Sequence, residues 1–233
     1  CASAERSFNT SLKPGTTLYV GTALDTIWTQ IYYHVWWPGQ GNDPMYLMNQ
    51  SMNRIRNNYY QDNDVVVNGT DDGHWTPRMY TNGKVSYGNP TTWISDSKTY
   101  LEDVSLYEVN LSGSQSGNKI SFDVKMNAIQ TTPASQDLRL FVATVMEIVQ
   151  YPASTNLLTE HHNPVIELLT GNTGKQMKFI SGITYTESFI WSMPDAWINH
   201  SDITWKSSDL KAVAWIQNYK SKEVLQVNEF GFD

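Results

Sequence analysis

Cys1 is the only cysteine among the 233 residues, and it opens a segment whose pattern predicts a helix. Over residues 1–12, Cys1, Ala4, Phe8 and Leu12 fall on one helical stripe. A thiol in the first turn of a helix is stabilised as a thiolate by the free backbone N–H groups and the helix dipole. A lone thiol forms no internal disulfide, so Cys1 by itself supports at most a mixed disulfide.

Two other interpretations of Cys1 stay open. An initial residue without any chemical role explains it equally well. An N-terminal cysteine is also where bacterial lipoproteins carry their lipid, but those proteins usually place a polar tether after the cysteine, whereas here a helical pattern starts at once. A lipid anchor at Cys1 is therefore compatible with the sequence but not favoured. We see no signal peptide, so we expect an exported form to be a processed chain.

Other groups that do chemistry form weaker patterns. Glu160, His161 and His162 are adjacent, so they cannot all point at one metal ion, and a further ligand is needed. The acidic stretch of 61–75 fits no EF-hand and favours a solvated loop. Motifs for a nucleophile elbow, a P-loop or a dinucleotide are absent from the sequence. We predict no metal and no cofactor.

Composition excludes several classes of protein. The net charge is −7 and no basic cluster occurs, which argues against nucleic acid as a partner. No apolar run is long enough to cross a bilayer, so we expect a protein that does not span the membrane. The low count of 16 Lys and Arg, with many Asn, Thr, Ser, Tyr and Trp, favours export. We predict an extracellular or outer-membrane-surface location.

The first third of the chain predicts alternating strand and helix. Residues 27–37 carry apolar side chains on both parities, as a central parallel strand covered on both faces does. Asp43 and Pro44 then favour the start of a helix. Its buried stripe is expected to be Met48, Met52, Ile55 and Tyr59.

Pro77 comes directly before a strand that contains the hairpin signal Asn82-Gly83. The Thr76–Pro77 bond can be cis, since a proline at a strand start donates no hydrogen bond to the ladder. A helix over 93–105 is expected to follow. Its cap would be Ser95, and its inward residues would be Ile94, Leu101 and Val104.

Beyond Ser105 the apolar period becomes that of β-strands, in six segments separated by turn-rich joints. The segments are 104–112, 118–129, 138–151, 175–191, 210–219 and 222–230. This spacing predicts an antiparallel sandwich. Residues 161–171 favour a short helix or a capped turn. We therefore expect two domains, 1–104 and 105–233.

Six matches run in order along nearly the whole chain: CASAERSFN, YYHVWWPGQGNDPMYLMN, NRIRNNYY, TPRMYTNG, RLFVATVMEIVQY with EHHNPVIELLTG, and VAWIQNYKSKEVLQ. Together they resemble the outer-membrane-protein-28-related family of secreted Bacteroidota proteins. The resemblance implies an α/β thioredoxin-like N-terminal domain followed by an all-β antiparallel sandwich, immunoglobulin-like or jelly-roll-like. It also implies export, often with a C-terminal sorting domain that is cleaved.

The same resemblance suggests three site residues. Cys1 matches the second cysteine of a C-x-x-C-A-S pattern whose first cysteine is absent here. Thr76 and Pro77 match the cis-proline loop that faces the cysteine pair in thioredoxin-like proteins. Cys1, Thr76 and Pro77 are therefore catalytic candidates only if the protein is redox-active.

Three functions remain under consideration. The first is a non-catalytic exported protein that acts in recognition or assembly with other exported or cell-surface proteins. The second is a thiol-disulfide oxidoreductase whose first active cysteine lies upstream of Cys1. The third is a carbohydrate-binding module that binds glycans on exposed tryptophans, although core packing is favoured for each of them. The tryptophans concerned are Trp93, Trp191, Trp197, Trp205 and Trp215.

Overall fold

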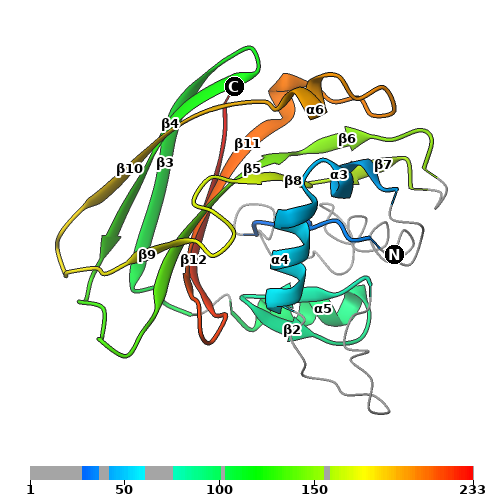
Figure 1. Cartoon of the computed structure of the whole chain (residues 1–233). Coiled ribbons are helices and arrows are strands. Elements are labelled where there is room, and N and C mark those ends of the chain that lie inside the picture. The colour runs from blue at the N-terminus through cyan, green and yellow to red at the C-terminus, as the bar shows by residue number, and fades with distance from the viewer. Residues whose placement is uncertain (1–27, 37–41, 61–75, 101–102, 155–157, 233) are drawn as a thin grey trace.

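The computed structural model describes residues 28–36, 42–60, 76–100, 103–154 and 158–232 (Figure 1). Cys1, the helix expected over 1–12 and the acidic stretch of 61–75 lie outside these residues. Within the described part, no helix is long and apolar enough to cross a membrane.

Two antiparallel sheets form the centre of the molecule. The smaller has the order β10 (Tyr185–Ser192), β4 (Lys119–Ala128), β3 (Tyr107–Ser116). The larger has the order β12 (Val224–Gly231), β11 (Leu210–Asn218), β5 (Leu138–Met146), β8 (Val165–Leu168), and β9 (Lys175–Met177) also pairs with β5. Figure 1 shows the two sheets facing each other, so this part of the molecule is β-sandwich-like.

Alternating apolar residues build the layer between the sheets. Ile120, Phe122, Val124 and Met126 of β4 are all buried there, whereas the residues between them point outward or are only half-buried. In a sheet with one solvated face this period of two places every second side chain in the core. Burial of these side chains is the main stabilising contribution to the sandwich.

Strands β5 and β11 are buried on both faces. Leu140 of β5 and Ala214 of β11 face the layer between the sheets, whereas Phe141 and Trp215 face the opposite way. The rings of Phe141 and Trp215 stack with their centroids 5.2 Å apart. The larger sheet therefore needs a cover on its outer face.

Residues before β3 supply this cover. They form α3 (Pro44–Leu47), α4 (Gln50–Tyr60), the hairpin β1 (Met79–Thr81) and β2 (Lys84–Ser86), and α5 (Pro90–Lys98). Figure 1 shows α4 standing across the larger sheet, with the hairpin and α5 at its lower end. Met52 of α4 packs into the same cluster as Phe141 and Trp215.

Shorter elements complete the fold. A second small pair of strands, β6 (Ile148–Gln150) and β7 (Glu160–His162), lies beside the larger sheet. The loop before β11 contains α6 (Asp195–Ile198) and the 3₁₀ turn η1 (Ser207–Asp209).

The expected thioredoxin-like domain is wrong. Every pair of strands in the described residues is antiparallel, and the stretch 28–36 forms no strand. Its one β-bridge is parallel and joins Tyr32 to Pro164. All residues of this stretch are half-buried, and Ile31 and Tyr33 pack against the cluster that contains Met52 and Phe141. The strands covered on both faces are β5 and β11.

Local predictions had mixed outcomes. Asp43 caps α3 as expected, by accepting from the backbone N–H groups of Met45 and Tyr46. The Asn82-Gly83 hairpin is also confirmed, and the Thr76–Pro77 bond is cis.

The expected helix boundaries and phases were less accurate. Ile55 was expected to be buried but is 41% exposed, since α4 turns a different face inward. The next helix begins after its cap at Asn89 and not at Ser95, and Val104 is 85% exposed. Residues 161–171 contain strand residues of β7 and β8 and form no helix, because they complete antiparallel pairs with β6 and β5.

The hairpin tip supports a test of the contact between the cover and the sandwich. Gly83 has φ +81°, and a Cβ there would lie 1.7 Å from the carbonyl oxygen of Lys222. Gly117 has φ +59° but open space around it. Gly117→Ala should cost about 1 kcal/mol from backbone strain alone, and Gly83→Ala at least about 2 kcal/mol. Urea unfolding of both variants measures the difference, and equal losses would contradict the close approach.

Candidate functional site

A cavity of about 230 Å³ lies where the cover meets the larger sheet. Four parts of the chain line it: the stretch 29–33, α4, the hairpin β1–β2 and the strands β11 and β12. Its lining residues are Thr29, Gln30, Ile31, Tyr32, Tyr33, Arg56, Asn57, Tyr60, Arg78, Met79, Tyr80, Asn82, Gly83, Val213, Trp215, Val224 and Val227. We call it the Arg56 cavity.

Arg56 is the one charged side chain of this lining that is fully buried, at 0% exposure. Its Nη1 donates to the carbonyl oxygen of Asn172 (3.3 Å). Its Nη2 donates to the Tyr60 hydroxyl (3.0 Å) and to Oε1 of Gln217 (3.4 Å). None of the ion pairs within the described residues involves Arg56. Its charge is therefore solvated by neutral dipoles and by aromatic rings.

Aromatic rings surround the guanidinium. Its Cζ lies 4.3 Å from the ring centroid of Phe141, 4.6 Å from that of Tyr59 and 4.9 Å from that of Tyr60. Cation–π contacts of this kind are strengthened when the groups are desolvated. Burial would lower the pKa of Arg56, but its tyrosine neighbours outweigh burial and raise that pKa. The side chain stays positively charged.

Two donors at this end of the cavity have no acceptor among the described residues. They are the Nε–H of Arg56 and the O–H of Tyr33, both shielded from solvent. The Tyr33 oxygen itself is a side-chain hydrogen-bond partner of Arg56, so the two groups lie beside each other. Burial, only partly opposed by the nearby Arg56, raises the pKa of Tyr33 to about 12. Tyr33 is therefore a neutral phenol that can donate. An unpaired buried donor costs free energy, so these groups favour an acceptor that enters the cavity.

A buried hydrogen-bond network holds this end in place. The side-chain amide of Gln217 is fully buried and donates to the Tyr60 hydroxyl (3.2 Å) and to the carbonyl oxygen of Lys222 (2.5 Å). The Tyr80 hydroxyl donates to the carbonyl oxygen of Tyr60 (2.8 Å) and so joins the hairpin to α4. The cavity is therefore held by contacts between elements far apart in sequence.

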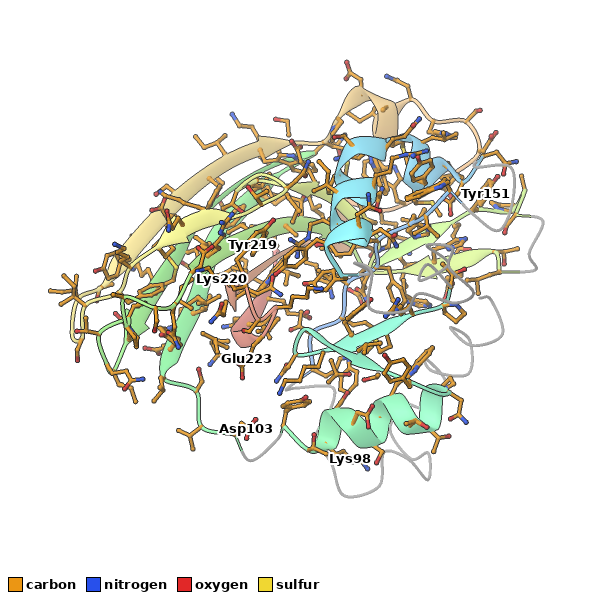
Figure 2. All side chains as sticks on the ribbon, turned by 60° about the horizontal axis from the view of Figure 1, so that its bottom comes forward. Lys98, Asp103, Tyr151, Tyr219, Lys220 and Glu223 are labelled. Carbon is orange, nitrogen blue, oxygen red and sulfur yellow. The ribbon has the colours of Figure 1, made fainter. Side chains whose placement is uncertain are left out.

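The turn between β11 and β12 lies next to the hairpin. The backbone N–H of Val224, the first residue of β12, donates to the carbonyl oxygen of Asn82 (3.1 Å). Figure 2 labels Tyr219, Lys220 and Glu223 in this turn. The Tyr219 ring stacks on that of Tyr59, with centroids 4.7 Å apart.

The resemblance suggested three site residues, and the structure describes two of them. Cys1 lies outside the described residues. Thr76 and Pro77 form a cis peptide bond directly before Arg78 and Met79, which line the Arg56 cavity. The structure therefore sets the proline beside a cavity-lining segment, and a redox role for the three residues stays a prediction.

The five tryptophans considered as a glycan-binding surface, all within the described residues, form no exposed platform. Four of the five considered above are 7% exposed or less, namely Trp93, Trp191, Trp197 and Trp215. The indole N–H of Trp191 donates to Oε2 of Glu167 (2.7 Å), and that of the half-buried Trp205 donates to the carbonyl oxygen of Trp197 (3.2 Å). Core packing, which the sequence favoured, explains these side chains.

The histidines form a separate polar cluster near α3. Nδ1 of His34 lies 2.7 Å from Oδ2 of Asp43, and the His34 and His161 rings are 5.4 Å apart. Burial would raise the pKa of Asp43, but His34 and the Tyr46 N–H outweigh it and lower that pKa. Within the part of the chain that the structure describes, no group of three or more His, Cys, Asp or Glu can hold a metal ion.

A second hollow of about 500 Å³ opens at one end of the sandwich. Its lining contains one charged residue, Glu108, whose carboxylate accepts from Asn110 and Asn127. It has no buried charge comparable to Arg56, so the Arg56 cavity is the stronger candidate.

No protein-family model and no curated protein matches this sequence. A domain of the outer membrane lipoprotein Omp28 from Porphyromonas gingivalis is similar, with 12% identity over 56% of this chain and 90% of that chain and a TM-score of 0.39. The sporulation control protein Spo0M from Bacillus subtilis aligns at 12% identity over 55% of this chain and 47% of its own, with a TM-score of 0.31.

A beta-glucosidase from Listeria innocua gives a TM-score of 0.27 at 12% identity, over 55% of this chain and 16% of that enzyme. Similarity of this degree establishes no family, fold or function for the present chain. For the family resemblance seen in the sequence, the comparisons therefore support a distant relation only, to a domain of an outer-membrane lipoprotein.

Sequence reasoning missed Arg56 because it placed α4 with the wrong face inward. The stripe actually buried includes Met52, Asn53 and Arg56. One signal was present: Met52, Arg56 and Tyr60 recur every four residues, so the arginine lies on the same helical face as Met52. A polar residue within an otherwise apolar stripe marks a candidate buried charge.

His161 supports a prediction about acid stability. It is 4% exposed, and burial together with the neighbouring His34 lowers its pKa from 6.5 to about 4. Between pH 6.5 and pH 4, His161 therefore binds a proton more readily in the unfolded chain than in the folded one. The contribution of neutral His161 to the free energy of unfolding should be fully present above pH 6.5. It should be lost as pH approaches 4, which lowers the free energy of unfolding by up to about 3 kcal/mol.

Urea unfolding at a series of pH values measures this loss. His161→Phe, which keeps a ring but cannot titrate, should flatten the slope between pH 6.5 and 4. His200→Asn, at a half-buried histidine in a loop, should keep the slope. An unchanged slope in His161→Phe would assign the acid sensitivity to other groups.

Proposed function

We propose that this chain is a non-catalytic binding protein that acts outside the cytoplasm and holds a small ligand in the Arg56 cavity. The observation that carries the proposal is a buried, charged guanidinium at the end of a cavity where two shielded donors lack acceptors. Pockets that recognise small molecules combine apolar walls with a few fixed polar groups in this way.

The chemistry of the lining supports binding over turnover. The described lining contains no cysteine, serine, histidine, aspartate or glutamate, which are the usual nucleophiles and general acids or bases. The raised pKa of Tyr33 keeps its hydroxyl protonated near neutral pH. This set of groups can hold and orient a ligand.

Export is the second part of the proposal. It is supported by composition, with 16 Lys and Arg in 233 residues and a net charge of −7. The thiol-disulfide alternative depended on a thioredoxin-like domain, and the antiparallel sheets of the described residues do not support that fold. Recognition of a ligand, with other exported proteins as further partners, is the function we retain.

A cavity-filling variant tests the binding function. Val227 of β12 lines the cavity and is half-buried, so Val227→Phe should occupy the space that a ligand would take. Val104→Phe makes the same change at an 85% exposed position outside the cavity. Saturation-transfer NMR with benzoate, phenylacetate, benzamide and glucose should show a binder for wild type and Val104→Phe, and at least a tenfold weaker signal for Val227→Phe.

Circular dichroism of Val227→Phe provides the control for folding, because overpacking costs about 1–3 kcal/mol. A folded Val227→Phe that binds the same compound as strongly as wild type would place the binding elsewhere. Absence of binding by all four compounds would contradict the proposed function.

A further inference from the structure

We infer that the ligand of the Arg56 cavity is a small carboxylate with an apolar body. Its carboxylate accepts from the Nε–H of Arg56 and from the Tyr33 hydroxyl, and its apolar part lies against the valines of β11 and β12. The inference rests on the proposed function and names the chemical class of its ligand.

The first support is the uncompensated charge. Arg56 is 0% exposed, and the ion pairs formed by the described residues all join other groups. Burying a cation without a counter-charge is costly even when dipoles and rings surround it. An anion that enters the cavity removes this cost, whereas a neutral ligand leaves it in place.

The second support is the number and kind of free donors. Nη1 and Nη2 of Arg56 make three hydrogen bonds, to the Asn172 carbonyl, to Tyr60 and to Gln217, so two of the five guanidinium hydrogens remain, the Nε–H and one on Nη1. The neutral Tyr33 phenol, a side-chain hydrogen-bond partner of Arg56, adds its own O–H. Adjacent donors of this kind, one group of them charged, match the two oxygens of a carboxylate.

The third support is the rest of the lining. Ile31, Met79, Val213, Trp215, Val224 and Val227 give the cavity an apolar wall. A phosphate has more acceptor oxygens than these donors can serve, and a sugar would leave hydroxyl groups unpaired against the valines. The volume of about 230 Å³ is below the usual range for drug-sized ligands, so the apolar body is about one ring or a short chain.

Paired probes separate charge from shape. Benzoate and benzamide have nearly the same outline, but only benzoate carries a charge. In isothermal titration at pH 7.5 and low salt, the intact protein should bind benzoate at least tenfold more tightly than benzamide. Inorganic phosphate and glucuronate should bind more weakly than benzoate. Equal affinity for benzoate and benzamide would overturn the inference.

Substitutions locate the carboxylate. Tyr33→Phe removes one hydroxyl and should weaken benzoate at least fivefold while leaving benzamide unchanged. Without ligand its urea midpoint should change little, because the Tyr33 O–H has no acceptor among the described residues and its oxygen is only one of several partners of Arg56. A purely structural role for the hydroxyl would instead lower that midpoint. Tyr46→Phe is the control, since the 2% exposed Tyr46 accepts from Arg54 outside the cavity lining.

Arginine variants on the same helix give a second matched pair. Arg56→Lys keeps a positive charge but loses the Nε–H position, so benzoate should bind at least tenfold more weakly. Arg54→Lys should have no effect, because Arg54 lies over the Trp36 ring at 4.3 Å and is absent from the cavity lining. Benzoate affinity that is unchanged in both Tyr33→Phe and Arg56→Lys would place the carboxylate elsewhere and overturn the inference.

Other outcomes distinguish this inference from the function on which it rests. The sequence shortly after Tyr60 carries Asp62, Asp64, Asp71 and Asp72, so a counter-charge within the chain is the rival explanation. If benzoate binds only after all four are changed to Asn, the chain compensates Arg56 itself and the inference fails. If benzamide binds and Val227→Phe blocks it while benzoate does not bind, the binding function stands and the carboxylate inference fails. If no probe binds, both fail.

Discussion

The burial of the Arg56 guanidinium is the constraint around which the outer half of this molecule is arranged. A cation withdrawn from water needs acceptors for its N–H groups and polarisable neighbours around it. Here they come from the loop carbonyl at Asn172, the amide of Gln217 and the rings of Tyr59, Tyr60 and Phe141. These groups belong to the helical cover and to both central strands of the larger sheet, so the charge ties the two layers together.

The sheet itself makes such a cover necessary. Strands β5 and β11 carry apolar side chains on both faces, which would leave Phe141, Val213 and Trp215 in water if the sandwich stood alone. Helix α4 shields them through Met52, but its next inward turn presents Arg56 and not another apolar residue. The cavity lies at the C-terminal end of α4, where Arg56, Asn57 and Tyr60 line it.

Much of the β-structure could be predicted from the sequence, because a period of two is a local property. The segments around β3, β4, β11 and β12 were recognised in this way, and the Asp43 cap and the Asn82-Gly83 turn depend on neighbours only a few residues away. The prediction of a strand over 28–36 was wrong because apolar residues at both odd and even positions occur in a covered strand and also in an irregular, half-buried segment. Residues 161–171 misled because their strand pairing depends on partners in β5 and β6.

The site could not be predicted for a related reason. Arg56 meets Asn172 at a separation of 116 residues and Gln217 at a separation of 161. No local pattern encodes such contacts, and the helical phase that exposes Ile55 becomes clear only once α4 is docked on the sheet. The inward face of α4 is therefore fixed by tertiary packing, which overrides the simplest apolar stripe.

The close approach of Gly83 to the Lys222 carbonyl has an evolutionary consequence. A side chain at Gly83 would collide with this carbonyl, so the turn requires glycine at that position. Lineages that keep this pocket should therefore retain that glycine together with the guanidinium on the helix and the amide on the neighbouring strand. In such proteins the spatial arrangement of these three residues would still indicate common descent after the pairwise sequence identity has become too low to do so.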